Sequence, residues 1–253
     1  MLQFRRFHEH SQAGRAFSEA EPSVENGALA AFVDSAIRDL RDLRRERADA
    51  AGFLWRSLEG IDRTLRTETL ERLDRDEVSD RRKLGIVEAL HGLNVLLFSY
   101  WRFLRAAAPL IRRINQREGR PARIVELAAG YGEFTLRAPA MARRMGLDIE
   151  VTGTDIVPAY VERARSEAVR RGVRAHFEVL DAFRMDVAPS RFDIALIAQS
   201  MHHFTAGQLA TMIAACRRVL TTGVVGVDGS TGPPVLTRGV IIWRFGDAGG
   251  ERY

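Results

Sequence analysis

The sequence has one cysteine, one lysine and no long apolar run, and each shortage excludes a class of structure. Cys216 cannot form an internal disulfide, and its place in an amphipathic helical pattern predicts a packed core residue; we expect no metal site. No stretch approaches the roughly 20 apolar residues of a membrane helix, and residues 1–17 lack the apolar middle of a secretory signal. We therefore expect a cytoplasmic protein without a membrane partner.

Lysine is replaced almost throughout by arginine. Lys83 is the only lysine among 38 basic residues, so 37 are arginine (38 minus 1). A sequence pI of about 10.1 would suit nucleic acid, because phosphate neutralisation dominates that affinity. However, the arginines of residues 41–47 are interleaved with acidic residues, which predicts a solvated helix face with local ion pairs. Nucleic acid is not the partner that this pattern favours.

The character of the chain changes near residue 119. Before it, apolar residues recur at helical spacing over 24–58, 61–73 and 84–114, after a loose arm at 1–23. Gly119 and Pro121 then stop the helical pattern. We predict an all-helical N-terminal cap or substrate lid over 1–118 and an α/β domain over 119–253.

Short β-rich runs alternate with amphipathic segments after this break. Strands are predicted at 122–127, 148–155, 174–181, 192–200 and 223–229, and helices at 133–145, 158–171 and 205–220. Strands alternating with helices of this length imply βαβ units and a mainly parallel sheet covered on both faces. Ligands bind such sheets beyond the carboxyl ends of the strands.

The first predicted strand ends in "ELAAGYGE", a glycine turn followed by a helix. Gly130 and Gly132 allow a sharp turn and a close approach to a ligand, and the helix that follows presents its amide-rich N-terminus. A dinucleotide site would have G-x-G-x-x-G, but Thr135 stands at the third glycine position. The pyrophosphate fingerprint is therefore incomplete.

Acidic residues mark three successive strand ends. Asp155 could accept both hydroxyls of a ribose, and Asp181 could accept an amine proton, with Ala182 and Phe183 offering an amide and an apolar wall to a flat ring. Together with Glu126 near the glycine turn, this acidic lining favours a cationic nucleoside over an anionic dinucleotide. The alternative is that Asp155 and Asp181 cap the helices that follow them.

These motifs, in this order, resemble a known family. The stretches "VELAAGYGE", "VTGTDI", "VLDAF", "FDIALIAQSMHHF" and "ACRRVLTTG" are similar to those of class I S-adenosylmethionine-dependent methyltransferases, over about residues 120–228. The resemblance implies a Rossmann-like doubly wound sheet of strand order 3-2-1-4-5, with S-adenosylmethionine as cofactor and S-adenosylhomocysteine as product. It also implies cofactor-binding roles for Glu126, Leu127, Ala128, Gly130, Gly132, Asp155, Ile156, Asp181, Ala182, Phe183 and Gln199.

Two departures from the family pattern stand out. Ala128 occupies a position where the family has glycine, a small-for-small change that we expect to be tolerated. The family sheet normally ends in a long helix and an antiparallel hairpin, whereas "GVIIWRF", residues 239–245, supplies one strand only. The sheet edge is then incomplete, closed by another subunit in a homodimer, or the chain is shortened.

The acceptor side of the expected site carries a pair of histidines. His202 and His203 follow the fourth strand, and imidazole titrates near neutrality, so either could act as general base, with His203 favoured. The alternative is that the pair orders the loop. In the preceding helix, Tyr100 or Arg102 could reach the methionine carboxylate or the acceptor, whereas packing is favoured for Trp101.

The sequence thus predicts methyl transfer to an oxygen, nitrogen or carbon atom of a small molecule, with a secondary metabolite preferred. The absence of an "NPPY"-type tetrapeptide at residues 199–202 counts against enzymes that methylate amino groups of nucleic acids or protein glutamine. Two alternatives stay open. One is a non-catalytic S-adenosylmethionine-binding protein with a degenerate acceptor site. The other, an NAD-dependent oxidoreductase, is disfavoured because Lys83 lies far from the motifs.

Overall fold

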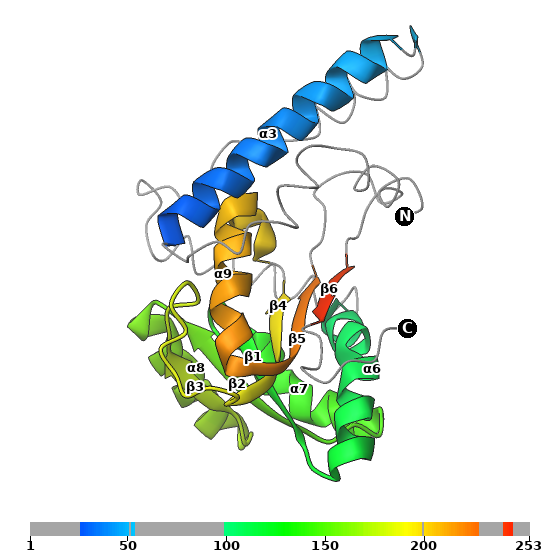
Figure 1. Cartoon of the computed structure of the whole chain (residues 1–253). Helices are drawn as coiled ribbons and strands as arrows, with labels where there is room; N and C mark the ends of the chain where they lie inside the picture. The colour runs from blue at the N-terminus through cyan, green and yellow to red at the C-terminus, as the bar shows by residue number, and fades with distance from the viewer. Residues whose placement is uncertain (1–25, 51, 54–98, 199, 228–239, 245–253) are drawn as a thin grey trace. The chain divides into compact units, whose positions relative to one another are not determined.

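The computed structural model describes residues 26–50, 52–53, 99–198, 200–227 and 240–244 (Figure 1). The helix expected over 61–73, and residues 84–98 of the helix expected over 84–114, lie outside these ranges. The chain divides into two compact units, one formed by residues 1–67 with 205–211 and the other by residues 68–204 with 212–253. Among the described residues, no helix has the length and apolar character needed to cross a bilayer.

The first unit contains helix α3, Asn26–Ala50, which the apolar periodicity predicted. Within this unit, the Asp34 carboxylate accepts hydrogen bonds from Thr205 Oγ1 at 2.9 Å and from the Gly207 amide at 2.8 Å. A Cβ at Gly207 would stand 2.2 Å from the carbonyl oxygen of Ala30. Glycine at position 207 therefore allows the backbone of α3 to approach this closely.

The second unit is built on a sheet of order β3-β2-β1-β4-β5-β6. Its strands are β1 Ala122–Leu127, β2 Ile149–Asp155, β3 His176–Val179, β4 Phe192–Ala198, β5 Leu220–Val227 and β6 Val240–Arg244. The first five strands are parallel, and β6 pairs antiparallel with β5. The predicted Rossmann-like order 3-2-1-4-5 is confirmed, as is the single strand expected from "GVIIWRF".

Helices cover both faces of this sheet. They are α6 Ser99–Glu118, α7 Glu133–Arg144, α8 Pro158–Arg171 and α9 Ala206–Val219. Right-handed crossovers place α7 and α8 on one face, and α9 lies on the other, as Figure 1 shows. Strand β3 is shorter than the predicted 174–181, and β5 begins three residues before the predicted residue 223. The predicted element types are otherwise those found.

Helix α6 packs against the sheet, although the sequence placed it in the N-terminal segment. Its apolar side meets α7, β1, β4 and β5 in one core cluster, in which Leu104 and Ile111 are fully buried. On the α9 side, Cys216 is also fully buried, and burial raises the pKa of its thiol to about 12. The prediction that Cys216 is a packed core residue is confirmed.

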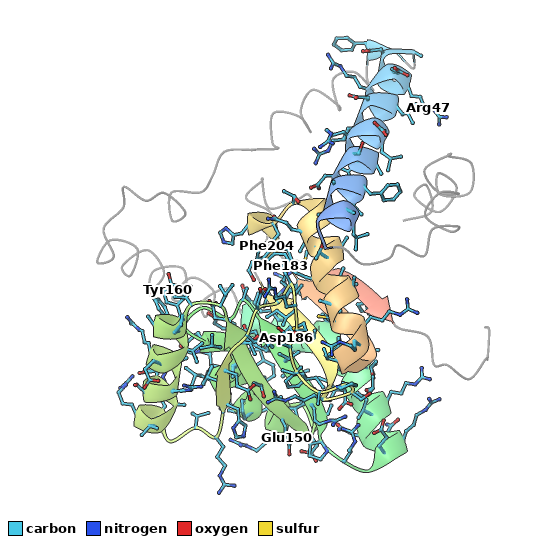
Figure 2. The ribbon with its side chains drawn as sticks, turned by 60° about the vertical axis from the view of Figure 1, so that its left-hand side comes forward. Arg47, Glu150, Tyr160, Phe183, Asp186 and Phe204 are labelled. Atoms are coloured by element: carbon cyan, nitrogen blue, oxygen red, sulfur yellow. The ribbon has the colours of Figure 1, made fainter. Side chains whose placement is uncertain are left out.

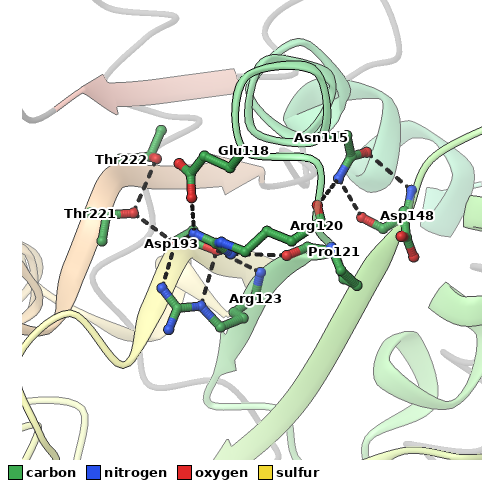
Figure 3. Close-up of polar contacts among 9 residues, drawn as sticks. All are labelled: Asn115, Glu118, Arg120, Pro121, Arg123, Asp148, Asp193, Thr221 and Thr222. Carbon is green, nitrogen blue, oxygen red and sulfur yellow. Dashed lines mark hydrogen bonds and ion pairs between the residues drawn. The ribbon is translucent and has the colours of Figure 1, made fainter.

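The amino-terminal edge of the sheet is held by one buried carboxylate. Asp193, at the start of β4, is fully buried and accepts hydrogen bonds from the guanidinium groups of Arg120 and Arg123 and from Thr221 Oγ1, at 2.7 to 2.9 Å (Figure 3). The backbone amide of Arg123 adds a further bond at 2.8 Å. These four residues, called here the Asp193 cluster, join the starts of β1, β4 and β5.

Candidate cofactor and acceptor site

The turn after β1 is left-handed at three positions. Ala128, Gly130 and Gly132 have φ values of 51°, 56° and 71°. Glycine adopts this region freely, whereas another L-residue is strained there by about 1 kcal/mol or more. Ala128, which stands where the family has glycine, therefore takes the conformation that a glycine would take. The substitution keeps the turn and adds a small local strain.

Asp155, at the end of β2, joins this turn to the next strand. Its Oδ2 accepts a hydrogen bond from the Gly130 amide at 2.8 Å, and its Oδ1 accepts one from the Val157 amide at 2.9 Å. Val157 is the N-cap residue of α8, so Asp155 supports the start of that helix as well as the turn. A carboxylate has about four lone-pair sites, and two therefore remain for a ligand's hydroxyls.

Glu126 lies beneath the turn, in β1, with 4% of its surface exposed. Its Oε2 accepts hydrogen bonds from Thr135 Oγ1 at 2.6 Å and from the Thr135 amide at 3.2 Å. Burial, and to a lesser extent the nearby charge of Asp155, raise the pKa of Glu126 to about 7, although the hydrogen bonds from Thr135 act to lower it. A buried acid titrating near neutrality at a strand end is typical of functional sites.

The ring of Phe177, in β3, packs closely against Gly132 in the glycine turn and Gly153 in β2. A Cβ at Gly132 would stand 2.2 Å from Phe177 Cε1, and a Cβ at Gly153 in β2 would stand 2.6 Å from the same atom. Phe177 is 6% exposed and packs with Leu136 and Val161 in a core cluster, so its ring has little room to move. The two glycines are therefore required by close packing.

The outer side of the turn is covered by aromatic and cationic side chains. Tyr131 packs edge-on against Tyr160 of α8, with ring centroids 4.9 Å apart. The guanidinium carbon of Arg163, also in α8, lies 4.4 Å from the Tyr131 ring centroid, a cation–π distance. The turn is thus bounded by Glu126 inside and by Tyr131 outside.

The ends of β3 and β4 bring a second group together. Asp181 Oδ1 accepts a hydrogen bond from the Phe183 amide at 2.8 Å, which shapes a local turn. The Phe183 ring meets Phe204, which follows β4, edge-on at 5.8 Å, and Figure 2 shows the two side by side. Ala182 is partly exposed, and Ile156 after β2 is 61% exposed, so apolar surface lies open at these strand ends.

The residues expected on the acceptor side are placed less completely. His203 is exposed in a short 3₁₀ helix, Met201–His203, whereas Gln199 and the side chain of His202 lie outside the described part. Tyr100 is 6% exposed and packs edge-on against Phe103 at 5.9 Å, so its ring belongs to the core between α6 and α7. Arg102 and Trp101 are partly buried.

The structure therefore brings together Glu126, the glycine turn and Asp155, and separately Phe183 with Phe204. Sequence reasoning did not assign site roles to Thr135, Phe177 or Phe204. Gly153 was a usable signal, since a glycine inside a strand often marks a close approach. The partner that approaches it, Phe177, could not be read from the sequence because the pairing depends on tertiary packing.

Comparison with known proteins gives a family match over part of the chain. The sequence profile described as "Methyltransferase domain" matches residues 124–223, which run from β1 into β5 and include the glycine turn and the carboxyl ends of β1 to β4. Residues 124–223 thus match a methyltransferase domain, and the parallel strand order 3-2-1-4-5 found here is the one that the class I resemblance implies. S-adenosylmethionine is the cofactor that this family implies.

Individual relatives match about half of the chain. Demethylmenaquinone methyltransferase of Deinococcus radiodurans is 28% identical over 123 residues, 49% of this chain and 46% of that protein. The chain thus spans about half the length of the curated relative it matches. Among solved structures, the PH0226 protein of Pyrococcus horikoshii is 25% identical with a TM-score of 0.37, covering 49% of this chain and 57% of that one. A putative sarcosine dimethylglycine methyltransferase of Galdieria sulphuraria is 17% identical with a TM-score of 0.40, covering 50% and 45%.

The donors and acceptors present at the strand ends fit this cofactor. Of the residues that the structure describes, none donates a hydrogen bond to Glu126 Oε1, so this buried oxygen can receive an ammonium. Asp155 retains acceptor sites for ribose hydroxyls, and exposed Ile156 offers apolar surface to a flat base. A second carboxylate near the turn would repel a pyrophosphate, which argues against a dinucleotide.

Proposed function

We propose that the methyltransferase domain transfers a methyl group from S-adenosylmethionine to an oxygen, nitrogen or carbon atom of a small molecule. The observation that supports this most is the juxtaposition of two carboxylates, Glu126 and Asp155, at the glycine turn. A cationic nucleoside complements this lining better than an anionic one. The Deinococcus radiodurans relative is named for transfer to demethylmenaquinone, a small molecule, which supports the same acceptor class.

In this proposal, residues at different strand ends bind different parts of the cofactor. The cofactor, when bound, supplies an electrophilic methyl group. Glu126 accepts the ammonium, Asp155 accepts the ribose hydroxyls, and the amide-rich start of α7 faces the methionine end. Asp181, Ala182, Phe183 and Ile156 hold and cover the adenine, and Leu127, Ala128, Gly130, Gly132 and Gln199 complete the lining. The chain then needs only to align the acceptor, exclude water and, for an O–H or N–H acceptor, remove a proton.

We propose His203 as the base for such an acceptor, with His202 as its alternative. His203 is exposed shortly after β4, and its backbone amide donates a hydrogen bond to the carbonyl oxygen of Ser200 within the 3₁₀ turn. The predicted cap or lid, residues 1–118, stays a proposal, with Arg102 rather than the buried Tyr100 as the residue that would reach the acceptor. A homodimer is one way to complete the site. Phe204 would give the acceptor an apolar wall.

Cofactor binding tests the class directly. In isothermal titration, the chain should bind S-adenosylmethionine and S-adenosylhomocysteine at micromolar concentrations and should not bind NAD. Asp155→Ala should reduce affinity by about 100-fold, because it removes the acceptor for the ribose hydroxyls and releases the Gly130 amide. Glu150→Ala, an exposed acid on the same strand, is the matched control and should bind as wild type does. Binding of NAD alone would overturn the proposal.

The proposed base is tested once an acceptor is found in a panel of small quinones, phenols and amines. His203→Ala should slow methyl transfer by about 100-fold, the lower range for general base catalysis, while cofactor affinity stays unchanged. His203→Gln keeps a polar side chain without a base and should be equally slow. An unchanged rate constant would refute the role of His203. Cofactor binding without transfer to any acceptor would favour the non-catalytic binding protein.

A further inference from the structure

Thr135 holds Glu126 from the first turn of α7. The N-cap residue of that helix is Gly132, which has no side chain to offer, and Thr135 is three residues further on. The Thr135 amide lies in the first turn of the helix, where backbone amides have no acceptor within the helix. It donates instead to Glu126 Oε2 in β1, at 3.2 Å. The hydroxyl of the same threonine donates to the same oxygen at 2.6 Å. Both side chains are buried, at 0% and 4% exposure.

This arrangement depends on the residue that breaks the dinucleotide fingerprint. A third glycine at position 135 would allow close packing of helix on strand, but it would have no hydroxyl. Here the room is made on the strand instead, since a Cβ at Gly153 would stand 3.0 Å from Thr135 Oγ1. Close packing of helix on strand is thus achieved with the glycine in β2, at position 153, and not in α7. Position 135 of α7 can then carry a hydroxyl, which donates to Glu126.

We propose that Thr135 is a positioning residue for cofactor recognition: its two hydrogen bonds fix Glu126 Oε2 and leave Oε1 to receive the ammonium of S-adenosylmethionine. The inference rests on the proposed function. A carboxylate pinned at one oxygen presents the other in a single orientation, so less conformational freedom is lost when the ligand binds. Thr154 Oγ1 supports the same strand by donating to the backbone carbonyl of Glu126 at 2.8 Å.

The arrangement also sets the pH range of binding. Glu126 must be ionised to receive an ammonium, and its pKa is about 7 because burial raises it more than the Thr135 bonds lower it. Asp155, from β2, is the one charged group among the described residues that acts on it, and it raises the pKa. Affinity should therefore rise as pH increases through the pKa of Glu126 in the free protein. Loss of the threonine hydroxyl should move this rise to higher pH.

The experiment measures affinity for S-adenosylhomocysteine from about pH 5.5 to about pH 8, on either side of that pKa. Thr135→Val removes the hydroxyl and keeps size, Thr135→Ala does so with less risk of steric strain, and Thr135→Ser keeps both bonds. Valine or alanine should raise the pH at the midpoint of the rise in affinity by about one pH unit, and should weaken binding about tenfold at neutral pH. Serine should restore the wild-type midpoint.

A second ligand separates positioning from a purely structural role. 5′-Methylthioadenosine has the nucleoside but neither ammonium nor carboxylate, so its affinity should be the same in wild type, Thr135→Val and Thr135→Ala, and independent of pH in this range. Glu126→Gln should remove the pH dependence for S-adenosylhomocysteine in every background. If both ligands weaken equally, or if the midpoint does not move, Thr135 only supports the fold and the inference is wrong. If wild type binds neither ligand, the proposed function itself fails.

Discussion

Gly132→Ala is expected to lower the free energy of unfolding by about 3 kcal/mol and to abolish binding of S-adenosylmethionine, although it adds a single methyl group. Two effects combine at this position. The new Cβ would stand 2.2 Å from the ring of Phe177, which is buried and cannot move aside at low cost. The residue would also have to keep a φ of 71°, which costs alanine about 1 kcal/mol or more.

The neighbouring glycines separate these two effects. Gly130→Ala has a φ of 56° and open space around its Cβ, so urea unfolding should show the conformational cost alone, about 1 kcal/mol. Gly153→Ala meets the same ring at 2.6 Å without a positive φ, so it should show the packing cost alone, about 2 kcal/mol. Gly132→Ala should be at least as destabilising as either one.

A compensating change tests the packing explanation. Phe177→Leu shortens the side chain that the new methyl group would meet, and by itself it should destabilise the protein through the cavity it leaves. The double variant Gly132→Ala/Phe177→Leu, however, should lose less unfolding free energy than the sum of the two single losses, by about 1 kcal/mol or more. Strict additivity of the two changes would show that the ring of Phe177 is not what excludes a side chain at position 132.

The strand order could be predicted from the sequence because several levels of pattern agree in this half of the chain. Strands β1, β2 and β4 are short apolar runs, and each is followed by an amphipathic helix of the length a crossover needs. The boundaries were less certain where the pattern fades. Strand β3 pairs over His176–Val179, where its partner β2 ends at Asp155, and no other strand of the described residues lies beyond β3.

The contacts of the candidate site could be predicted only in part. Glu126, Gly130 and Asp155 were chosen because they stand at strand ends, and the structure indeed brings them together. Which donor satisfies each carboxylate was not visible, since Thr135 bonds Glu126 across nine residues and two elements. Such pairings depend on register and helix placement, which local spacing does not determine.

Tyr100 shows the opposite difficulty. Aromatic residues on several sides of one helix suggested that one of them faces a ligand, but helix α6 contacts both α7 and the sheet, so its apolar surface is wide. The Tyr100 ring is buried beside Phe103, with the Arg137 guanidinium 5.9 Å from its centroid. A wide apolar surface is what a helix packed between two partners requires, and the pattern alone does not distinguish this from a ligand wall.

Asp193→Asn is expected to be the most destabilising isosteric change at the amino-terminal edge of the sheet, about 3 kcal/mol at pH 7. Breaking a buried ion pair from one side costs about 3 to 5 kcal/mol. We expect the lower value because the side chains of Arg120 and Arg123 are 31% and 35% exposed and keep some water. Asp186→Asn, an exposed acid in the loop before β4, should change stability by less than about 0.5 kcal/mol.

The pH dependence of the stability difference tests whether the negative charge of Asp193 causes the loss of stability in Asp193→Asn. The bonds from Arg120 and Arg123 hold the pKa of Asp193 well below its usual range despite burial. A carboxyl group whose pKa is lower in the folded than in the unfolded state stabilises the fold above its unfolded pKa, about 3.9, and this contribution is lost as pH falls through the folded pKa. The stability gap between wild type and Asp193→Asn, measured by urea unfolding, should therefore be constant from about pH 8 to about pH 5 and shrink below about pH 4. A gap that persists unchanged at low pH would mean that the geometry of the Thr221 and Arg123 amide bonds, rather than charge, makes Asp193 necessary.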